Sequence, residues 1–133
     1  MLGKWELNKV HYEDSYKAIK ELPSKSVDLI IADPPYEIDI HGGASNRISR
    51  TFANCINDIS VMSQGIDLKI LEEFMRIMKR PNIYIWCNKK QVLDYLDFFV
   101  KEHQCSFEIL FWGKTNPTPL CGGNYLIDKE ICL

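Results

Sequence analysis

The sequence has no long hydrophobic run, although 46% of its 133 residues are hydrophobic. No stretch approaches the ~20 consecutive apolar residues that a membrane-spanning helix needs. The amino-terminal segment Met1–Trp5 also lacks the apolar core of a secretory signal peptide. We therefore expect one compact cytoplasmic domain over residues 1–133, with a buried core and no membrane partner.

Paired cysteine motifs are missing too. The five cysteines are scattered without C-x-x-C spacing, and the three histidines do not cluster with them. Disulfide frameworks and zinc sites both depend on such spacing. We expect no metal site and free or buried thiols in a reducing compartment. The cysteines are Cys55, Cys87, Cys105, Cys121 and Cys132.

The chain also lacks an excess of positive charge. The sequence contains 16 Lys and Arg residues and 18 Asp and Glu residues, which gives a net charge of −2. The chain as a whole therefore has no electrostatic attraction to nucleic-acid phosphates. Any phosphate contact must come from a local cluster of basic residues.

The most informative stretch is the almost wholly apolar run Val27–Ala32 and the four residues after it. A run without polar alternation predicts a strand covered on both faces. The next residues, Asp33-Pro34-Pro35-Tyr36, end this strand sharply, because proline has a fixed φ and no N–H group. The result is a rigid corner with a carboxylate, free carbonyls and an aromatic ring. Ligands bind at such strand ends in open α/β sheets.

This corner suits an exocyclic amine on a flat ring. The Asp33 carboxylate and the Pro34 carbonyl can each accept one hydrogen of an amino group, and Tyr36 can stack on the heterocycle. Holding both hydrogens out of the ring plane exposes the nitrogen lone pair to an electrophile. Asp33 would then stabilise the positive charge that develops on nitrogen in the transition state.

The corner and the preceding Ser26–Ile31 resemble the catalytic motif of the amino-group DNA methyltransferases. These enzymes transfer a methyl group from S-adenosylmethionine to adenine N6 or cytosine N4. Residues 12–23 and 111–119 resemble two further segments of the family, and the motif order is similar to its permuted class. The resemblance implies a catalytic role for Asp33, Pro34, Pro35 and Tyr36.

The resemblance also implies where the methyl donor binds. Asp14 corresponds to an acidic residue that approaches the adenosine of the donor, and Asp33 is a second candidate for a cofactor contact. Asp14 also lies between a short strand, expected at about Asn8–Tyr12, and a helix that Ser15 is expected to cap. A first-turn charge favoured by the helix dipole is therefore the alternative role of Asp14.

The family's glycine-rich cofactor turn, Phe-x-Gly-x-Gly, does not occur in this sequence. The pairs Gly42-Gly43 and Gly122-Gly123 have the wrong spacing, and neither follows a buried strand and opens a helix. The chain therefore resembles only the catalytic half of such an enzyme, with an incomplete S-adenosylmethionine site.

Four further residues are candidates for substrate contacts besides Tyr36. Arg47 and Arg50 lie in the irregular segment 37–65 and are either phosphate contacts or solvated surface. Trp112 and Lys114 resemble residues of the target-base pocket. The alternative is that Trp112 packs in the core and Lys114 is surface.

Strand and helix patterns alternate along the rest of the chain. Asp67 is expected to cap a helix with an apolar stripe from Leu68 to Met78, before a buried strand over Asn82–Trp86. Asn88 is expected to cap the next helix, whose packed side carries Val92, Leu96, Phe99 and Val100. Lys89, Lys90 and Gln91 would form its exposed first turn.

A strand over Ser106–Trp112 and an antiparallel partner over Tyr125–Cys132 complete the pattern. The fold class is α/β, because repeated strand–helix units favour a mostly parallel sheet. The resemblance implies a partial Rossmann-like methyltransferase fold, with an antiparallel carboxyl-terminal strand and helices on both faces.

These observations favour the catalytic half of a DNA adenine N6-methyltransferase acting directly on a flipped-out adenine. DNA is the expected partner, and the sequence is compatible with a homo-oligomer. The alternatives are an inactive remnant or a non-enzymatic binding domain, and a methyltransferase for cytosine N4 or an RNA base.

Overall fold

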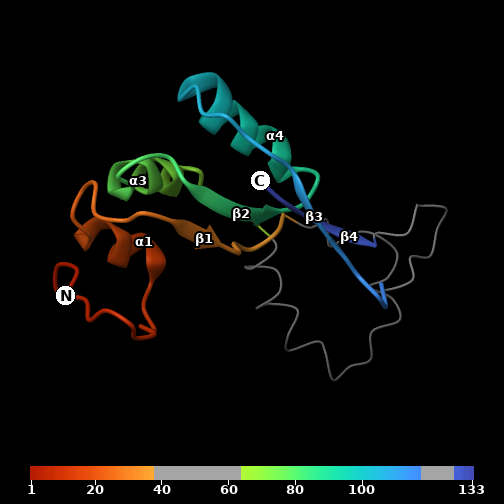
Figure 1. The fold of residues 1–133 in the computed structure, drawn as a ribbon. Coiled ribbons are helices and arrows are strands. Elements are labelled where there is room, and N and C mark those ends of the chain that lie inside the picture. The colour runs from red at the N-terminus through yellow and green to blue at the C-terminus, as the bar shows by residue number, and fades with distance from the viewer. Residues whose placement is uncertain (38–63, 118–127) are drawn as a thin grey trace. The chain divides into compact units, whose positions relative to one another are not determined.

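The computed structural model describes residues 1–37, 64–117 and 128–133 of the chain (Figure 1). The chain divides into two compact units. Unit 1 contains Met1–Ala32 and Asp67–Tyr84, and unit 2 contains Asp33–Ile66 and Ile85–Leu133. Among the described residues, no helix is long and apolar enough to cross a membrane. The elements are α1 Ser15–Ala18, the 3-10 helix η1 Ile19–Glu21, β1 Ile30–Ala32, α3 Lys69–Ile77, β2 Ile83–Cys87, α4 Gln91–Leu96, the π-helix η4 Asp97–Glu102, β3 Leu110–Gly113 and β4 Lys129–Cys132.

The core of unit 1 is the apolar face of α3. Ile70, Leu71, Phe74 and Ile77 are buried, and their spacing of three or four residues places them on one side of the helix. The Asp67 carboxylate accepts a hydrogen bond from the Lys69 amide at 3.0 Å. This confirms the predicted cap and the predicted core stripe, except that Leu68 is 43% exposed.

Arg76 ties α3 to the segment around η1. Its guanidinium donates to the Leu22 and Ile19 carbonyls, each at 2.8 Å, and to the Ser24 hydroxyl at 3.2 Å. The remaining contact is an ion pair with Glu73 at 2.7 Å. One side chain therefore donates to two carbonyls at the end of η1, where the Ile19 carbonyl also accepts from the Leu22 amide at 3.1 Å.

The prediction that the strand after Val27 is covered on both faces is wrong. Only Ile30–Ala32 forms β1, whereas Val27 makes an isolated parallel bridge with Met78. Leu29 is 42% exposed and Ile31 is 70% exposed. Both side chains lie on the same side of the strand, because side chains alternate along it. That face of β1 remains open to solvent, so the apolar run does not reflect burial on both sides.

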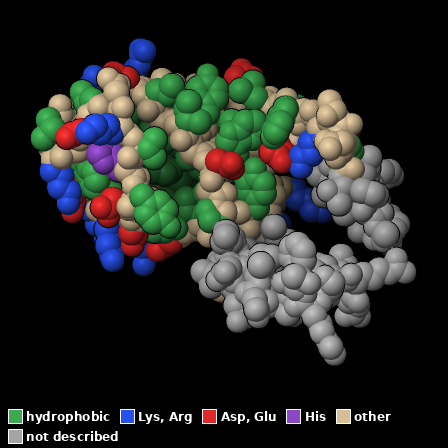
Figure 2. All heavy atoms as spheres, turned by 90° about the horizontal axis from the view of Figure 1, so that it is seen from below, with side chains coloured by type: hydrophobic (Ala, Val, Ile, Leu, Met, Phe, Trp, Pro, Cys, Tyr) green, Lys and Arg blue, Asp and Glu red, His purple; other side chains and the backbone are tan. Residues whose placement is uncertain are grey.

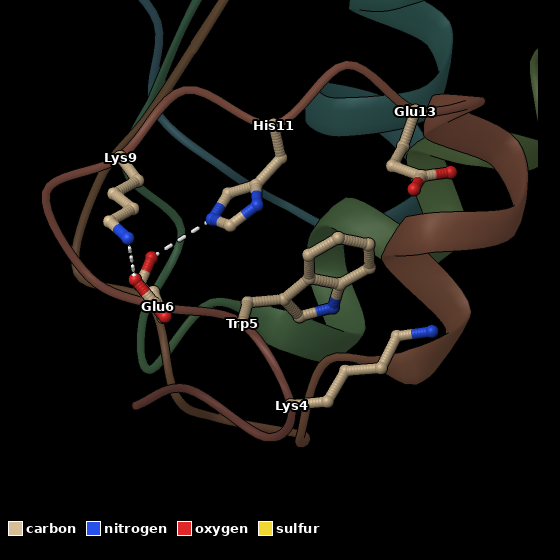
Figure 3. Close-up of a pocket in the computed structure, with 6 residues that line it drawn as sticks. All are labelled: Lys4, Trp5, Glu6, Lys9, His11 and Glu13. Carbon is tan, nitrogen blue, oxygen red and sulfur yellow. Dashed lines mark hydrogen bonds and ion pairs between the residues drawn. The ribbon is translucent and has the colours of Figure 1, made fainter.

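The predicted strand at Asn8–Tyr12 is also wrong. Asn8 has a positive φ of 60°, and Val10 and Tyr12 are fully exposed. This segment instead borders a hollow of about 390 Å³, lined by Lys4, Trp5, Glu6, Lys9, His11 and Glu13 (Figure 3). The Trp5 and His11 rings meet edge to face at 5.0 Å, and the Glu6 carbonyl hydrogen-bonds His11. These local contacts replace the sheet pairing that a strand would need.

Unit 2 is built on the antiparallel strand β4. Trp86 of β2 pairs with Cys132, and Leu110 to Gly113 of β3 pair with Cys132 to Lys129. The strand order is β1-β2-β4-β3, and the unit boundary falls within β2. β4 is antiparallel to both of its neighbours, β2 and β3. The α/β class with an antiparallel carboxyl-terminal strand is confirmed.

The packed side of α4 differs from the predicted one. Gln91, Tyr95 and Phe99 are buried at intervals of four residues, with Gln91 only 3% exposed. Val92, Leu96 and Val100 are partly buried. The prediction of an exposed first turn is therefore wrong for Gln91, because its polar groups find partners inside unit 2. Asn88 does cap the helix, since its side-chain oxygen accepts from the Lys90 and Gln91 amides.

Strand β3 exposes large apolar side chains of unit 2. Figure 2 shows apolar side chains at the surface over much of the face in view. Every residue of β3 is exposed, including Phe111 at 62% and Trp112 at 58%. Cys87 and Cys132, in contrast, are buried free thiols, and burial raises the pKa of Cys87 to about 11. Such thiols stay protonated and unreactive near neutral pH.

Candidate active site

The corner Asp33–Tyr36 follows β1 directly and lies in unit 2. Asp33 precedes a proline and is therefore restricted to extended conformations, as is Pro34 before Pro35. The Asp33 side chain is exposed, whereas Tyr36 is partly buried. The carboxylate is thus open to an incoming ligand and is not locked into the core.

Tyr36 orients the Asp33 carboxylate. The two side chains are hydrogen-bonded, and the Tyr36 phenol also feels the negative charge of Glu130. Burial, followed by the charge of Asp33, raises the pKa of Tyr36 to about 12. The phenol therefore remains protonated and donates to one Asp33 oxygen. The other carboxylate oxygen still has acceptor capacity for an amine.

This raised pKa predicts a loss of stability at high pH. Since Tyr36 titrates near 12 in the folded chain and near 10 when unfolded, its stabilising contribution is complete below about pH 10. The contribution then falls as the pH rises toward 12. We expect urea midpoints of the wild type to drop more steeply between pH 10 and 12 than those of Tyr36→Phe. Tyr84→Phe, which alters an exposed tyrosine, should retain the wild-type slope, and equal slopes in all three proteins would contradict the assignment.

Lys114 and Glu130 form an ion pair beside the corner. Their side chains meet at 2.7 Å and are 33% and 24% exposed. The Lys114 amide also donates to the Asp128 carbonyl at 2.7 Å. Lys114 is therefore engaged within unit 2 in this structure, so a role in binding substrate would require this pair to open.

Trp112 lies opposite Glu130 in the β3–β4 register. Its ring meets Trp86 edge to face at 6.3 Å, and its exposure of 58% overturns the alternative that it packs in the core. An exposed ring near Glu130 is compatible with base stacking, so its place in a base pocket stays a prediction. Arg47 and Arg50 lie outside the described residues, and their predicted phosphate contacts stay predictions as well.

Asp14, the candidate cofactor contact, acts as a helix cap in unit 1. Its carboxylate accepts from the Tyr16 amide at 2.9 Å and pairs with Lys17 at 3.6 Å. The cap is therefore one residue earlier than the predicted Ser15. The carboxylate is exposed and can accept further hydrogen bonds, so a cofactor contact remains a proposal.

Sequence reasoning missed the residues behind the corner. Gln91 donates to the Pro35 carbonyl at 3.0 Å, and Asn88 donates to the Glu37 carbonyl. Glu37 also forms an isolated bridge with Gln64, next to Gly65 at a positive φ of 76°. The spacing of Gln91, Tyr95 and Phe99 was the available signal, because it marks one helical face that begins with a polar residue.

Comparisons with known proteins give related sequences and similar solved structures. The chain is 26% identical to the Type II methyltransferase M.HinfI of Haemophilus influenzae over 132 residues, which cover 88% of this chain and 34% of that protein. It is 30% identical to the Type II methyltransferase M2.LlaDCHI of Lactococcus lactis subsp. cremoris over 115 residues, or 81% of this chain and 42% of that protein. For M2.DpnII of Streptococcus pneumoniae the identity is 28%, with the same coverage. No protein-family model matches the chain.

Among solved structures, the crystal structure of an M1.HpyAVI-SAM complex matches with a TM-score of 0.55 and 19% identity. The match covers 92% of this chain and 50% of that chain, and it shows the fold. The chain thus spans about a third to two-fifths of the length of the curated relatives. These findings confirm the resemblance predicted from the corner: over four-fifths or more of its length, the chain is similar to part of the Type II DNA methyltransferases.

Proposed function

We propose that this chain is the target-base half of a DNA adenine N6-methyltransferase. The observation that carries the proposal is the exposed Asp33 carboxylate, oriented by Tyr36 on a bend stiffened by two prolines. The sequence similarity to Type II methyltransferases supports DNA as the substrate class. Aspartate at the first motif position leans toward adenine over cytosine.

In the proposed reaction, the flipped-out adenine presents its amino group to the corner. One hydrogen is accepted by the Asp33 carboxylate and the other by the Pro34 carbonyl, while the base stacks on an aromatic ring. S-adenosylmethionine supplies an electrophilic methyl group. Asp33 stabilises the positive charge that the amine nitrogen acquires as its bond to the methyl carbon forms. The sulfur–methyl bond of the donor would break as the new bond forms, with a neutral thioether as the leaving group. The nitrogen would then lose one proton to water, which leaves a neutral secondary amine.

The described residues fit only part of a methyl-donor site. The described glycines are Gly3, Gly65 and Gly113, and none of them opens a helix directly after a strand. The Asp14 carboxylate caps α1, and no other described residue in this segment is assigned to the donor. The described part of the chain therefore accounts for the base-binding side of the reaction. An incomplete or inactive domain is the second candidate function, because the described residues supply no glycine turn for the donor.

Nucleoside binding tests the base-binding half on this chain directly. Deoxyadenosine is compared with the purine deoxynucleoside that lacks the 6-amino group, by NMR titration. We expect about 10-fold tighter binding of deoxyadenosine, because hydrogen bonds to a charged acceptor contribute about 1.5–3 kcal/mol. Deoxycytidine and adenosine in the same series address the cytosine and RNA alternatives. Equal affinity for the two purines would contradict the proposal.

A methyl-transfer assay tests the hypothesis that this chain takes part in catalysis. A hybrid in which this chain replaces the matching segment of M.HinfI is incubated with DNA and tritiated S-adenosylmethionine. We expect label in adenine N6. Calorimetry of the isolated chain with S-adenosylmethionine separates a complete donor site, which would release or absorb heat, from the incomplete domain, which would not.

A further inference from the structure

The beginning of α4 supports the corner from behind through Gln91. This side chain is buried, and each of its polar groups has a partner in unit 2. Its amide nitrogen donates to the Pro35 carbonyl at 3.0 Å and to the Tyr95 hydroxyl at 3.4 Å. Its oxygen accepts from the Asn88 amide at 3.2 Å. A buried glutamine with these partners is held in one rotamer, so the Pro35 carbonyl has a fixed donor.

Asn88 holds the Glu37 carbonyl, two residues after Pro35. Its side-chain nitrogen donates to the Glu37 carbonyl, while its oxygen caps the amides of Lys90 and Gln91. Lys90 adds an ion pair to Glu37 at 3.4 Å. The two amide side chains therefore attach the beginning of α4 to the carbonyls of Pro35 and Glu37.

These attachments use the Pro35 and Glu37 carbonyls and leave the Pro34 carbonyl out. Among the described residues, no donor satisfies the Pro34 carbonyl, which keeps this acceptor available beside the exposed Asp33 carboxylate.

We propose that Gln91 and Asn88 are positioning residues that fix the Pro34 carbonyl and the Asp33 carboxylate as a pair of acceptors for a base amino group. We call these two residues the brace. The brace rests on the proposed function for its ligand, but its effect on the corner is independent of any reaction. Neither residue touches the reacting atoms, so both act through the backbone of Pro35 and Glu37.

Gln91→Met is the informative variant, because methionine keeps the length and helix propensity of glutamine but cannot donate. We expect the preference for deoxyadenosine over the amine-less purine to fall from about 10-fold to below about 3-fold, while binding of the amine-less purine is unchanged. A purely structural defect would weaken both nucleosides alike. Leu93→Met, on the exposed side of the same helix, is the matched control and should keep the wild-type preference.

Asn88→Asp separates the brace from the cap. Aspartate retains the oxygen that accepts from the Lys90 and Gln91 amides, but it loses the donor to the Glu37 carbonyl. We expect a lower melting temperature, because a carboxylate oxygen now meets the Glu37 carbonyl, together with a reduced preference for the amino group. A wild-type preference in both Gln91→Met and Asn88→Asp would overturn the brace.

The Tyr36 titration keeps the inference separate from the proposed function. With ¹³C-labelled tyrosine, the Tyr36 phenol of the wild type should titrate near 12. In Gln91→Met the pKa of Tyr36 should fall toward 10, because Asp33 is no longer held near the phenol. If Gln91→Met changes neither the nucleoside preference nor the pKa of Tyr36, the brace fails. If the pKa of Tyr36 falls in Gln91→Met but the wild type shows no preference for deoxyadenosine, the proposed function fails and the brace stands.

Discussion

Asp33→Asn should reduce methyl transfer by the M.HinfI hybrid about 10²- to 10³-fold, the usual loss when one preorganised electrostatic group is removed. The substitution keeps the shape of the side chain but removes its charge. The neutral amide can accept a hydrogen from the base, yet it stabilises the positive charge on nitrogen much less. The loss should therefore be larger in kcat than in the affinity for DNA.

Two observations make this result interpretable. The pKa of Tyr36 should fall in Asp33→Asn, because Asp33 contributes both charge and a hydrogen bond to that phenol. This fall shows that the substitution has reached the corner. Asp28→Asn is the matched control, since Asp28 is also exposed and its carboxylate pairs with Lys79 at the surface of unit 1. Wild-type activity in Asp33→Asn would remove this carboxylate from the mechanism.

Arg76→Met should lower the free energy of unfolding by about 2–4 kcal/mol, a large effect for a partly exposed residue. Methionine keeps the aliphatic contacts of α3 but removes the guanidinium donor from the Leu22 and Ile19 carbonyls, and only the Ile19 carbonyl retains a backbone donor, the Leu22 amide. It also leaves Glu73 without its ion pair. Urea unfolding followed by tryptophan fluorescence measures the change.

The control for Arg76→Met is Arg80→Met, which removes an exposed arginine just beyond the same helix. We expect a change within about 0.5 kcal/mol for this surface position. A similar small change in Arg76→Met would mean that water replaces the guanidinium at both carbonyls. The carbonyls near η1 would then not depend on α3 for their hydrogen bonds.

Much of the fold was predictable because its signals are local. The Asp67 cap and the three-to-four spacing of Leu71, Phe74 and Met78 specify α3 without any knowledge of its neighbours. The strand over Ile83–Cys87 follows from a short apolar run bounded by Pro81 and Asn88. These features depend on the chain within about one helical turn of each residue.

The errors concern features that depend on distant neighbours. The apolar residues Leu29 and Ile31 predicted a buried strand, but both are exposed. Burial requires another element to cover these side chains, and a local sequence pattern cannot show whether one does. Val10 and Tyr12 alternate like a strand yet have no pairing partner among the described residues. Gln91 was placed at the surface because polar residues usually lie there.

The corner was predictable for a chemical reason. A carboxylate and two prolines after an apolar strand restrict the backbone by covalent geometry alone. The supporting residues were not predictable, since the partners of the Pro35 and Glu37 carbonyls lie more than 50 residues along the chain. Glu130 near Tyr36 likewise depends on the pairing of β4 with β3.

The exposed strand β3 has a practical consequence for handling the purified chain. An environment-sensitive dye such as ANS will bind Phe111 and Trp112 in the native state and will fluoresce before any heating begins. A dye-based melting curve would therefore start from a high baseline and would resemble that of a molten globule. Circular dichroism in the near ultraviolet, which reports ordered aromatic packing, is the appropriate criterion of nativeness.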